Sequence, residues 1–254
     1  MAFEGRFGAQ AGEYSAFRPV WPREVFTRIL ARAEEPRRCA VDLGAGTGLV
    51  AAHLAEHFGE VVAVEPDERM LARLAPDPAI RALRARAEEV DFEPGCIDLV
   101  TAGNAFHWME GAAVCERAHA WLRPGGVLAV FRYDPPHAAA GALEALLHHE
   151  YSVVWRAHVH PRLHDSDYTR RTVAESRFGP TLEATWIAND VALTLDELLG
   201  FLRSTSYGGG HARSLAEPEG YWRELGERVR AAAGPGPFVL DFGVELLLAG
   251  KESE

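Results

Sequence analysis

The stretch Val41-Asp42-Leu43-Gly44-Ala45-Gly46-Thr47-Gly48 joins a short apolar run to a segment whose apolar residues recur at helical spacing. The run from Cys39 to Leu43 predicts a buried strand, and a helix is expected directly after the glycines, on Leu49, Val50, Leu54 and Phe58. Glycines at such a turn let a ligand approach the backbone, and the N-terminus of the helix favours negative charge. The stretch therefore predicts a binding site for a nucleotide-like cofactor.

The spacing of the three glycines distinguishes two kinds of cofactor. A dinucleotide-binding turn has the pattern G-x-G-x-x-G, but the third glycine here comes one residue early, and Leu49 stands where that pattern needs Gly or Ala. Glu65 ends the next apolar run about twenty residues after Gly44, where an acid reaches ribose hydroxyls. The alternative for Glu65 is an acid at a helix N-terminus, favoured by the helix dipole. The spacing favours S-adenosylmethionine over NAD.

Strand and helix patterns alternate along the chain on both sides of this turn. Such alternation predicts parallel strands with helices on both faces of the sheet. Residues 137–180 show helical periodicity without an obvious strand, so we expect a helical cap inserted into a single domain that spans 1–254. The other expected elements are helices at 22–34, 49–58, 70–74, 117–122, near 195 and at 221–233, and strands at 61–64, 97–101, 127–131, 182–193 and 238–248.

Charge and cysteine content limit the partners and the compartment. Lys and Arg number 26 against 37 Asp and Glu, so the net charge is −11, which repels a phosphate backbone and argues against a nucleic-acid partner. Cys39, Cys96 and Cys115 contain no C-x-x-C pair, which disfavours a disulfide framework and fits a reducing cytoplasm. Without a signal peptide or a run of ~18 apolar residues, we expect a soluble cytoplasmic protein with no membrane partner.

Together, the motifs resemble those of class I S-adenosylmethionine-dependent methyltransferases of the methyltransferase type 11 group, which includes trans-aconitate-methyltransferase-like proteins. The resemblance is densest from Phe7 to Tyr133 and includes the glycine turn, Glu65, a Y-x-x-x-R-P-x-x-P opening at Tyr14 to Pro22, and the turn Pro124-Gly125-Gly126. It implies an α/β fold with a Rossmann-like, doubly wound, mostly parallel seven-stranded sheet and an N-terminal helical lid at 1–35. It also implies transfer of the methyl group of S-adenosylmethionine to a small molecule.

The resemblance further implies which residues contact the cofactor and border the reacting methyl group. The adenine-contacting stretch, usually Asp-Ala-Glu, is Arg86-Ala87-Glu88 here, so only the backbone of Ala87 corresponds directly. The segment Asn104 to Trp108 is similar to an A-x-H-W signature, which makes His107 and Trp108 the catalytic candidates. Arg18 is expected to pair with the carboxylate of the cofactor. The cofactor-binding candidates are Tyr14, Arg18, Asp42, Gly44, Ala45, Gly46, Gly48, Glu65, Pro66, Ala87, Glu88 and Asn104.

Two other functions are weighed against methyl transfer. An NAD(P)-binding oxidoreductase needs a later third glycine and a Tyr-Lys or His relay, whereas the single lysine is Lys251. A non-catalytic S-adenosylmethionine-binding regulator keeps the glycine turn but loses the methyl-side residues, which are present here. A structural histidine and a core tryptophan are the alternatives for His107 and Trp108. The histidines of the cap lack an H-E-x-x-H arrangement, so no metal is expected.

The acceptor is expected to be a small molecule with a carboxylate or a hydroxyl, bound beneath the cap. Arginines pair well with carboxylates, and a locally positive pocket attracts an anion. A hydroxyl acceptor benefits from a base at His107, whereas a carboxylate needs none. The alternative for the arginines is solvated pairing with nearby acids, and the sequence leaves the acceptor atom and the oligomeric state open. The arginines in or beside the cap are Arg132, Arg156, Arg162, Arg170, Arg171 and Arg177.

Overall fold

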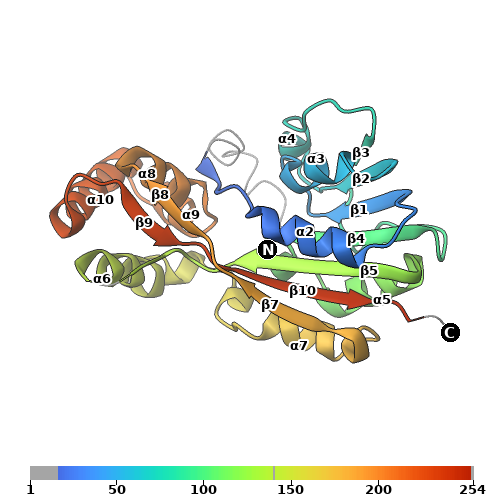
Figure 1. The fold of residues 1–254 in the computed structure, drawn as a ribbon. Helices are drawn as coiled ribbons and strands as arrows, with labels where there is room; N and C mark the ends of the chain where they lie inside the picture. The colour runs from blue at the N-terminus through green and yellow to red at the C-terminus, as the bar shows by residue number, and fades with distance from the viewer. Residues whose placement is uncertain (1–16, 140, 253–254) are drawn as a thin grey trace.

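Seven strands form the main sheet of the computed structural model, which describes residues 17–139 and 141–252 (Figure 1). Their order is β3-β2-β1-β4-β5-β10-β7, with β1 to β5 parallel and β10 antiparallel to both of its neighbours. The predicted doubly wound, mostly parallel sheet is therefore confirmed. The strands are β1 (Cys39–Leu43), β2 (Glu60–Val64), β3 (Ile80–Leu83), β4 (Ile97–Gly103), β5 (Leu122–Tyr133), β7 (Glu183–Ile187) and β10 (Val244–Gly250).

Helices pack on both faces of this sheet, which is why its central strands are continuous apolar runs. On one face, α2 (Arg23–Arg32) and α3 (Leu49–Ala55) share an apolar core with β1 and β2. On the other face, α5 (Gly111–Trp121) and α7 (Tyr168–Ala174) share a second core. The short α4 (Glu68–Leu71) follows β2. The helices expected between 22 and 122 are all present, although α4 ends at Leu71 and not at residue 74.

A smaller lobe lies beside one end of the main sheet (Figure 1). Its antiparallel sheet has the order β6-β9-β8, and its apolar core contains Trp155, Phe201 and Phe242, which are fully buried. The strands and helices of the lobe are β6 (His137–Ala138), β8 (Asp190–Leu193), β9 (Phe238–Asp241), α6 (Ala142–His149), α8 (Leu195–Ser204), α9 (Gly208–Arg213) and α10 (Pro218–Ala233).

Two stretches expected as single strands each contribute to both sheets, which corrects the predictions for 182–193 and 238–248. The first divides into β7 and β8, and the second divides into β9 and β10. The two crossings meet where the Phe242 N–H donates to the Asn189 carbonyl at 2.9 Å. A Cβ at Gly243 would lie 2.6 Å from Cε2 of Trp186, so glycine permits this close approach. Apolar residues lie on both sides of each crossing, and the chain passes between the sheets at the polar pair Asn189-Asp190 and at Asp241 to Gly243.

The insert at 137–180 is also corrected, because it does not form one helical cap. Its first part contains β6, α6 and a turn of π-helix at Glu150–Val154, and it belongs to the smaller lobe. Its second part contains α7 and packs on the main sheet, where Phe178 is fully buried. The remainder of the lobe comes from β8, β9 and α8 to α10, so the cap is assembled from two separate stretches of sequence.

Two further expectations differ from the structure or fall outside it. The strand β3 was not expected, because Ile80–Leu83 lies at the sheet edge and none of its four residues is fully buried. Of the lid predicted at 1–35, residues 1–16 lie outside the described residues, and α2 packs on the main sheet. Within 17–139 and 141–252, none of the helices is long and apolar enough to cross a membrane.

Candidate functional site

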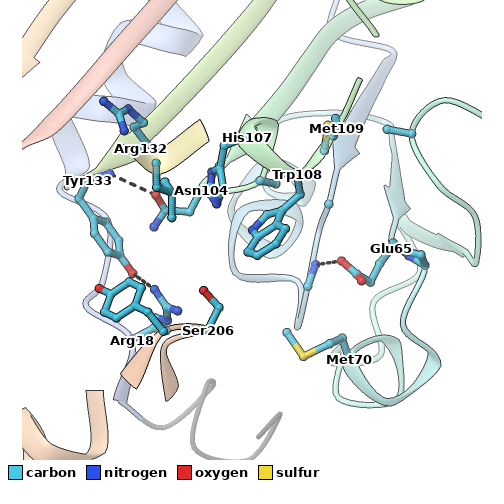
Figure 2. A pocket seen from close by; sticks show the side chains of 18 of the residues that line it. Arg18, Glu65, Met70, Asn104, His107, Trp108, Met109, Arg132, Tyr133 and Ser206 are labelled. Carbon is cyan, nitrogen blue, oxygen red and sulfur yellow. Dashed lines mark hydrogen bonds between the residues drawn. The ribbon is translucent and has the colours of Figure 1, made fainter. Parts of the chain in front are cut away.

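A cavity opens at the carboxyl ends of β1, β2 and β4, next to the smaller lobe. Ligands of doubly wound folds bind at such strand ends. Figure 2 shows Arg18 and Tyr133 at one end of the cavity, Glu65 and Met70 at the other, and His107 and Trp108 between them. A smaller hollow adjoins the cavity, and the residues that line both are Arg18, Gly44, Gly103, Asn104 and Tyr133.

The glycine turn forms the floor of the cavity. Gly44, Gly46 and Gly48 have φ angles of 67°, 57° and 87°, a region that side chains other than glycine rarely adopt. A Cβ at Gly44 would lie 2.5 Å from Cβ of Ala105, so the turn packs directly against the loop after β4. Gly44 and Gly46 line the cavity, whereas Gly48 is the N-cap of α3 and lines neither part. The role of Gly48 is therefore in the turn itself.

Glu65 lies at the end of β2 and is only 6% exposed. Its carboxylate accepts hydrogen bonds from the backbone N–H groups of Gly46 and Asp67, each at 3.0 Å. Burial raises the pKa of Glu65, and these two N–H groups act in the opposite direction. The carboxylate is thus held rigidly between the glycine turn and the loop after β2, facing the cavity (Figure 2).

Two buried oxygens of the smaller hollow make no hydrogen bond within the described residues. They are Oδ2 of Asp42 and Oγ1 of Thr47. The other carboxylate oxygen of Asp42 accepts from the Thr101 hydroxyl at 2.7 Å. Buried polar atoms normally have partners, so both oxygens fit a polar ligand in the hollow. An ammonium, such as the one on the amino-acid end of S-adenosylmethionine, would satisfy Asp42. Ala45 also lines this hollow.

The ionisation of Asp42 predicts a pH dependence of cofactor binding. Burial raises the pKa of Asp42 to about 7, so below this pH the cofactor-free protein holds a proton that an ammonium must displace. We expect the Kd of S-adenosylhomocysteine, measured by titration calorimetry, to rise about tenfold per pH unit below 7. Because the folded-state pKa exceeds that of an unfolded aspartate, the free energy of unfolding of the cofactor-free protein falls as the pH rises from about 4 to about 7 and levels off above that.

The Asp42→Asn variant is the control for this dependence. It should bind S-adenosylhomocysteine more weakly at pH 8 but with little change between pH 8 and pH 6, because the titrating carboxylate is gone. An unchanged slope in this variant would assign the pH dependence to another group.

The predicted adenine-contacting stretch and Pro66 line the cavity. Pro66, Arg86, Ala87 and Glu88 all reach the cavity, and Ala87 is buried. The guanidinium of Arg86 pairs with Glu88 at 3.5 Å, and Glu88 accepts from the N–H of Glu110 at 2.7 Å. Arg86 therefore neutralises Glu88, which in turn ties this loop to the loop before α5. This accounts structurally for the arginine that departs from the family pattern.

The loop after β4 carries the catalytic candidates. Asn104 has a φ of 50°, and its side-chain oxygen accepts from the N–H of Tyr133 at 3.2 Å, which joins the ends of β4 and β5 (Figure 2). His107 is 8% exposed and lines the cavity with Trp108. Burial, followed by the positive fields of His160, Arg132, Arg18 and Arg162, lowers the pKa of His107 to about 3. The imidazole is therefore neutral at physiological pH.

The two N-terminal candidates have different outcomes. Arg18 donates to the Tyr133 hydroxyl at 2.7 Å and to the Ser204 carbonyl at 3.4 Å, so it links the main sheet to α8 at the junction of the cavity and the hollow. Its pairing with the cofactor's carboxylate stays a prediction. Tyr14 lies outside the described residues.

The arginines expected around the acceptor mostly face elsewhere. Arg132 lines the cavity, but Arg170 pairs with Glu245 and Arg171 pairs with Asp165, each at 2.5 Å. Arg162 pairs with Glu110 at 3.1 Å and also donates to the carbonyl of Met109. Among the described residues, Arg132 is the one of the six that lines the cavity, and acids bind Arg162, Arg170 and Arg171, so the expectation that the insert supplies a cluster of arginines to the cavity is wrong.

The cavity also includes residues that the sequence interpretation missed. Tyr133 closes β5, whose apolar run was read only as a buried strand. The others are isolated residues without a motif, and no local signal identifies them. The residues missed are Met70, Gly103, Met109, Tyr133, Asp134, Pro135, Tyr151, Leu163, Ser206 and Tyr207. Among the described residues there is no cluster of three or more His, Cys, Asp or Glu side chains with metal-binding geometry.

Known proteins resemble this chain both in sequence and in fold. Residues 41–130 match the family profile described as a methyltransferase domain. A Dictyostelium discoideum protein named as a methyltransferase is 25% identical over 211 residues, 80% of this chain and 78% of that protein. An uncharacterized methyltransferase of Mycobacterium tuberculosis is 38% identical over 123 residues, 48% of this chain and 49% of that relative, so the match spans about half its length.

A solved structure agrees with this chain in three dimensions over nearly its whole length. It is named as a type II methyltransferase from Anaeromyxobacter dehalogenans, and it superposes with a TM-score of 0.76 at 26% identity. The superposition covers 94% of this chain and 100% of that chain. It therefore includes the smaller lobe as well as the main sheet.

Proposed function

We infer that this chain, a class I S-adenosylmethionine-dependent methyltransferase, transfers the methyl group of its cofactor to the carboxylate of a small molecule. The observation that carries this choice of acceptor is the burial of His107 close to Arg18, Arg132 and Arg162. A proton placed on His107 would be repelled by all three guanidinium groups. The imidazole therefore acts poorly as a base, which favours an acceptor that arrives already ionised.

The bound cofactor supplies an electrophilic methyl group on a sulfonium centre. A carboxylate oxygen forms a bond to the methyl carbon as the carbon–sulfur bond breaks, giving a methyl ester and S-adenosylhomocysteine, with no proton to remove. What the chain must supply is alignment, which accounts for much of the acceleration in such displacements. Gly44, Gly46 and Glu65 position the nucleoside end, and Asp42 fits the ammonium at the other end. The neutral His107 and Trp108 then border the space left for the acceptor.

The charges around the cavity support an anionic acceptor despite the net charge of −11. Arg18 and Arg132 both line the cavity, and the cofactor has a single carboxylate for them to bind. Arg132 is shared with Asp134 at 3.1 Å and Glu245 at 3.6 Å, so its field in the cavity is reduced but not removed. A local field of this kind attracts anions at short range even where the whole molecule repels them.

Neither alternative from the sequence has the same support. Two observations argue against an oxidoreductase. The similar proteins are named as methyltransferases, and the glycine spacing of the turn is that of the S-adenosylmethionine class. For a non-catalytic binding protein, the cavity extends well beyond the nucleoside end and includes His107, Trp108 and Tyr133. Such an extension provides room for a second ligand.

The acceptor class is tested with matched acids and alcohols: benzoate with benzyl alcohol, and cinnamate with cinnamyl alcohol. We expect S-adenosylhomocysteine to form from the acids with a kcat/KM at least about tenfold higher than from the alcohols. His107→Ala should lower the rate with an acid by less than about tenfold, because the loss of a general base costs roughly 10²- to 10⁴-fold. Turnover of the alcohols that is lost in His107→Ala would overturn the carboxylate proposal and restore a base role for His107.

A further inference from the structure

Two tyrosines of the smaller lobe face the main sheet across the cavity. Tyr151 and Tyr207 both line it, and their rings meet edge to face at 87° with centroids 5.2 Å apart. Trp108 and Leu163 line the same region. Burial raises the pKa of Tyr151 to about 12, so its hydroxyl keeps its proton and remains a donor. This part of the cavity is therefore an aromatic and apolar wall, defined here as the tyrosine wall of Tyr151 and Tyr207.

Tyr151 belongs to the π-helical turn Glu150–Val154, an uncommon conformation that occurs frequently at functional sites. The turn contains a fully buried carboxylate, that of Glu150. The two oxygens of Glu150 accept from the Tyr221 hydroxyl at 2.6 Å and from the Arg228 guanidinium at 2.7 Å, both on α10. An ionised carboxylate with these donors anchors the turn to α10 directly beside Tyr151.

Glu150 is also connected to Tyr207, through Tyr221 and Trp155. The indole N–H of Trp155 donates to the Tyr221 hydroxyl at 2.6 Å. The Trp155 ring stacks on Tyr207 with centroids 5.7 Å apart and an interplanar angle of 28°. The contacts therefore form a closed circuit from Glu150 through Tyr221, Trp155 and Tyr207 to Tyr151. Trp155, Tyr221 and Glu150 do not themselves line the cavity, so they support the two wall residues from outside it.

We propose that Tyr151 and Tyr207 select the acceptor by its carbon skeleton, favouring a planar, aromatic or conjugated carboxylic acid, and that Glu150 is the positioning residue that holds both rings in place. This inference rests on the proposed function for the identity of the acid group, but selection of the carbon skeleton is a separate property. Aromatic rings pack well against flat apolar groups, and the preference depends on ring orientation. A buried carboxylate costs desolvation energy even when it is paired, so its presence behind the two rings is consistent with a positioning role.

The test measures the binding of cinnamate and propionate to the protein saturated with S-adenosylhomocysteine. The readout is the ratio of the two Kd values from titration calorimetry, which a smaller folded fraction does not change. We expect the wild type to prefer cinnamate at least tenfold. Tyr151→Ala should reduce this preference about tenfold, and Glu150→Gln, which keeps the size of the side chain, should reduce it several-fold. Neither variant should change the Kd of S-adenosylhomocysteine by more than about twofold.

Glu219→Gln is the matched control, because Glu219 pairs with Arg203 at 3.1 Å elsewhere in the lobe and is exposed. It should retain the full preference for cinnamate. If Glu150→Gln does not fold, Tyr221→Phe tests the same circuit, since it removes the hydroxyl that joins Glu150 to Trp155. Equal binding of both acids by the wild type, or an unchanged ratio in Tyr151→Ala, overturns the proposal. Absence of ester formation with an intact cinnamate preference would overturn the proposed function alone.

Discussion

Gly46→Val is expected to abolish measurable binding of S-adenosylhomocysteine while leaving a folded protein. Gly46 has a φ of 57°, where a β-branched residue is a genuine outlier, and it lines the cavity beside Glu65. A valine there adds a side chain at the turn and displaces the N–H that donates to Glu65 at 3.0 Å. Titration calorimetry should show at least about a 100-fold weaker Kd, the equivalent of ~2.7 kcal/mol.

Gly95→Val is the control that separates the loss of cofactor binding expected for Gly46→Val from the effect of backbone strain. Gly95 has a φ of 73°, and a Cβ there would meet nothing within 4 Å. Both variants therefore incur the cost of a left-handed conformation, about 1–2 kcal/mol, which thermal unfolding will report. Only Gly46→Val should also lose cofactor binding. Equal binding by Gly46→Val and the wild type would mean that the cofactor does not approach this turn.

Glu65→Ala is expected to weaken binding of S-adenosylhomocysteine by about 5- to 150-fold. This range corresponds to roughly 1–3 kcal/mol, the contribution of hydrogen bonds to a charged group. The structure favours the upper part of the range, because the carboxylate also orders the N–H groups of Gly46 and Asp67. The loss should appear in the Kd of the cofactor and in its KM, with kcat at saturating cofactor close to that of the wild type.

Asp67→Ala is the matched control for Glu65. Asp67 is a buried acid in the same loop and accepts from the N–H of Arg69 at 2.9 Å, which caps α4. Its replacement should lower the free energy of unfolding by about 0.5–2 kcal/mol through loss of the cap, with a smaller effect on cofactor affinity than Glu65→Ala. A Glu65→Ala variant whose loss appears only in kcat would remove Glu65 from the cofactor site.

The nucleoside end of the site was predictable from sequence because it is built from contiguous residues. The glycine turn joins β1 to α3 within a few positions, and Glu65 is placed by the end of β2. Parallel strands bring these two loops to the same edge of the sheet, so the order of strands and helices suffices to place them together. The same argument located the loop with Asn104, His107 and Trp108, which follows β4.

Which residues line the proposed acceptor end of the cavity depends on the tertiary structure. Tyr151 and Tyr207 come from the two stretches that form the smaller lobe, and their approach depends on how these stretches pack together, which the hydrophobic pattern of either stretch does not specify. The arginines show the same limit, since Arg132 lines the cavity while Arg170 pairs with Glu245 on β10. Sequence periodicity reports which face of an element is buried, but not which other element buries it. The side chains proposed to meet the acceptor are therefore set by long-range packing, whereas those proposed to meet the cofactor are set by local turns.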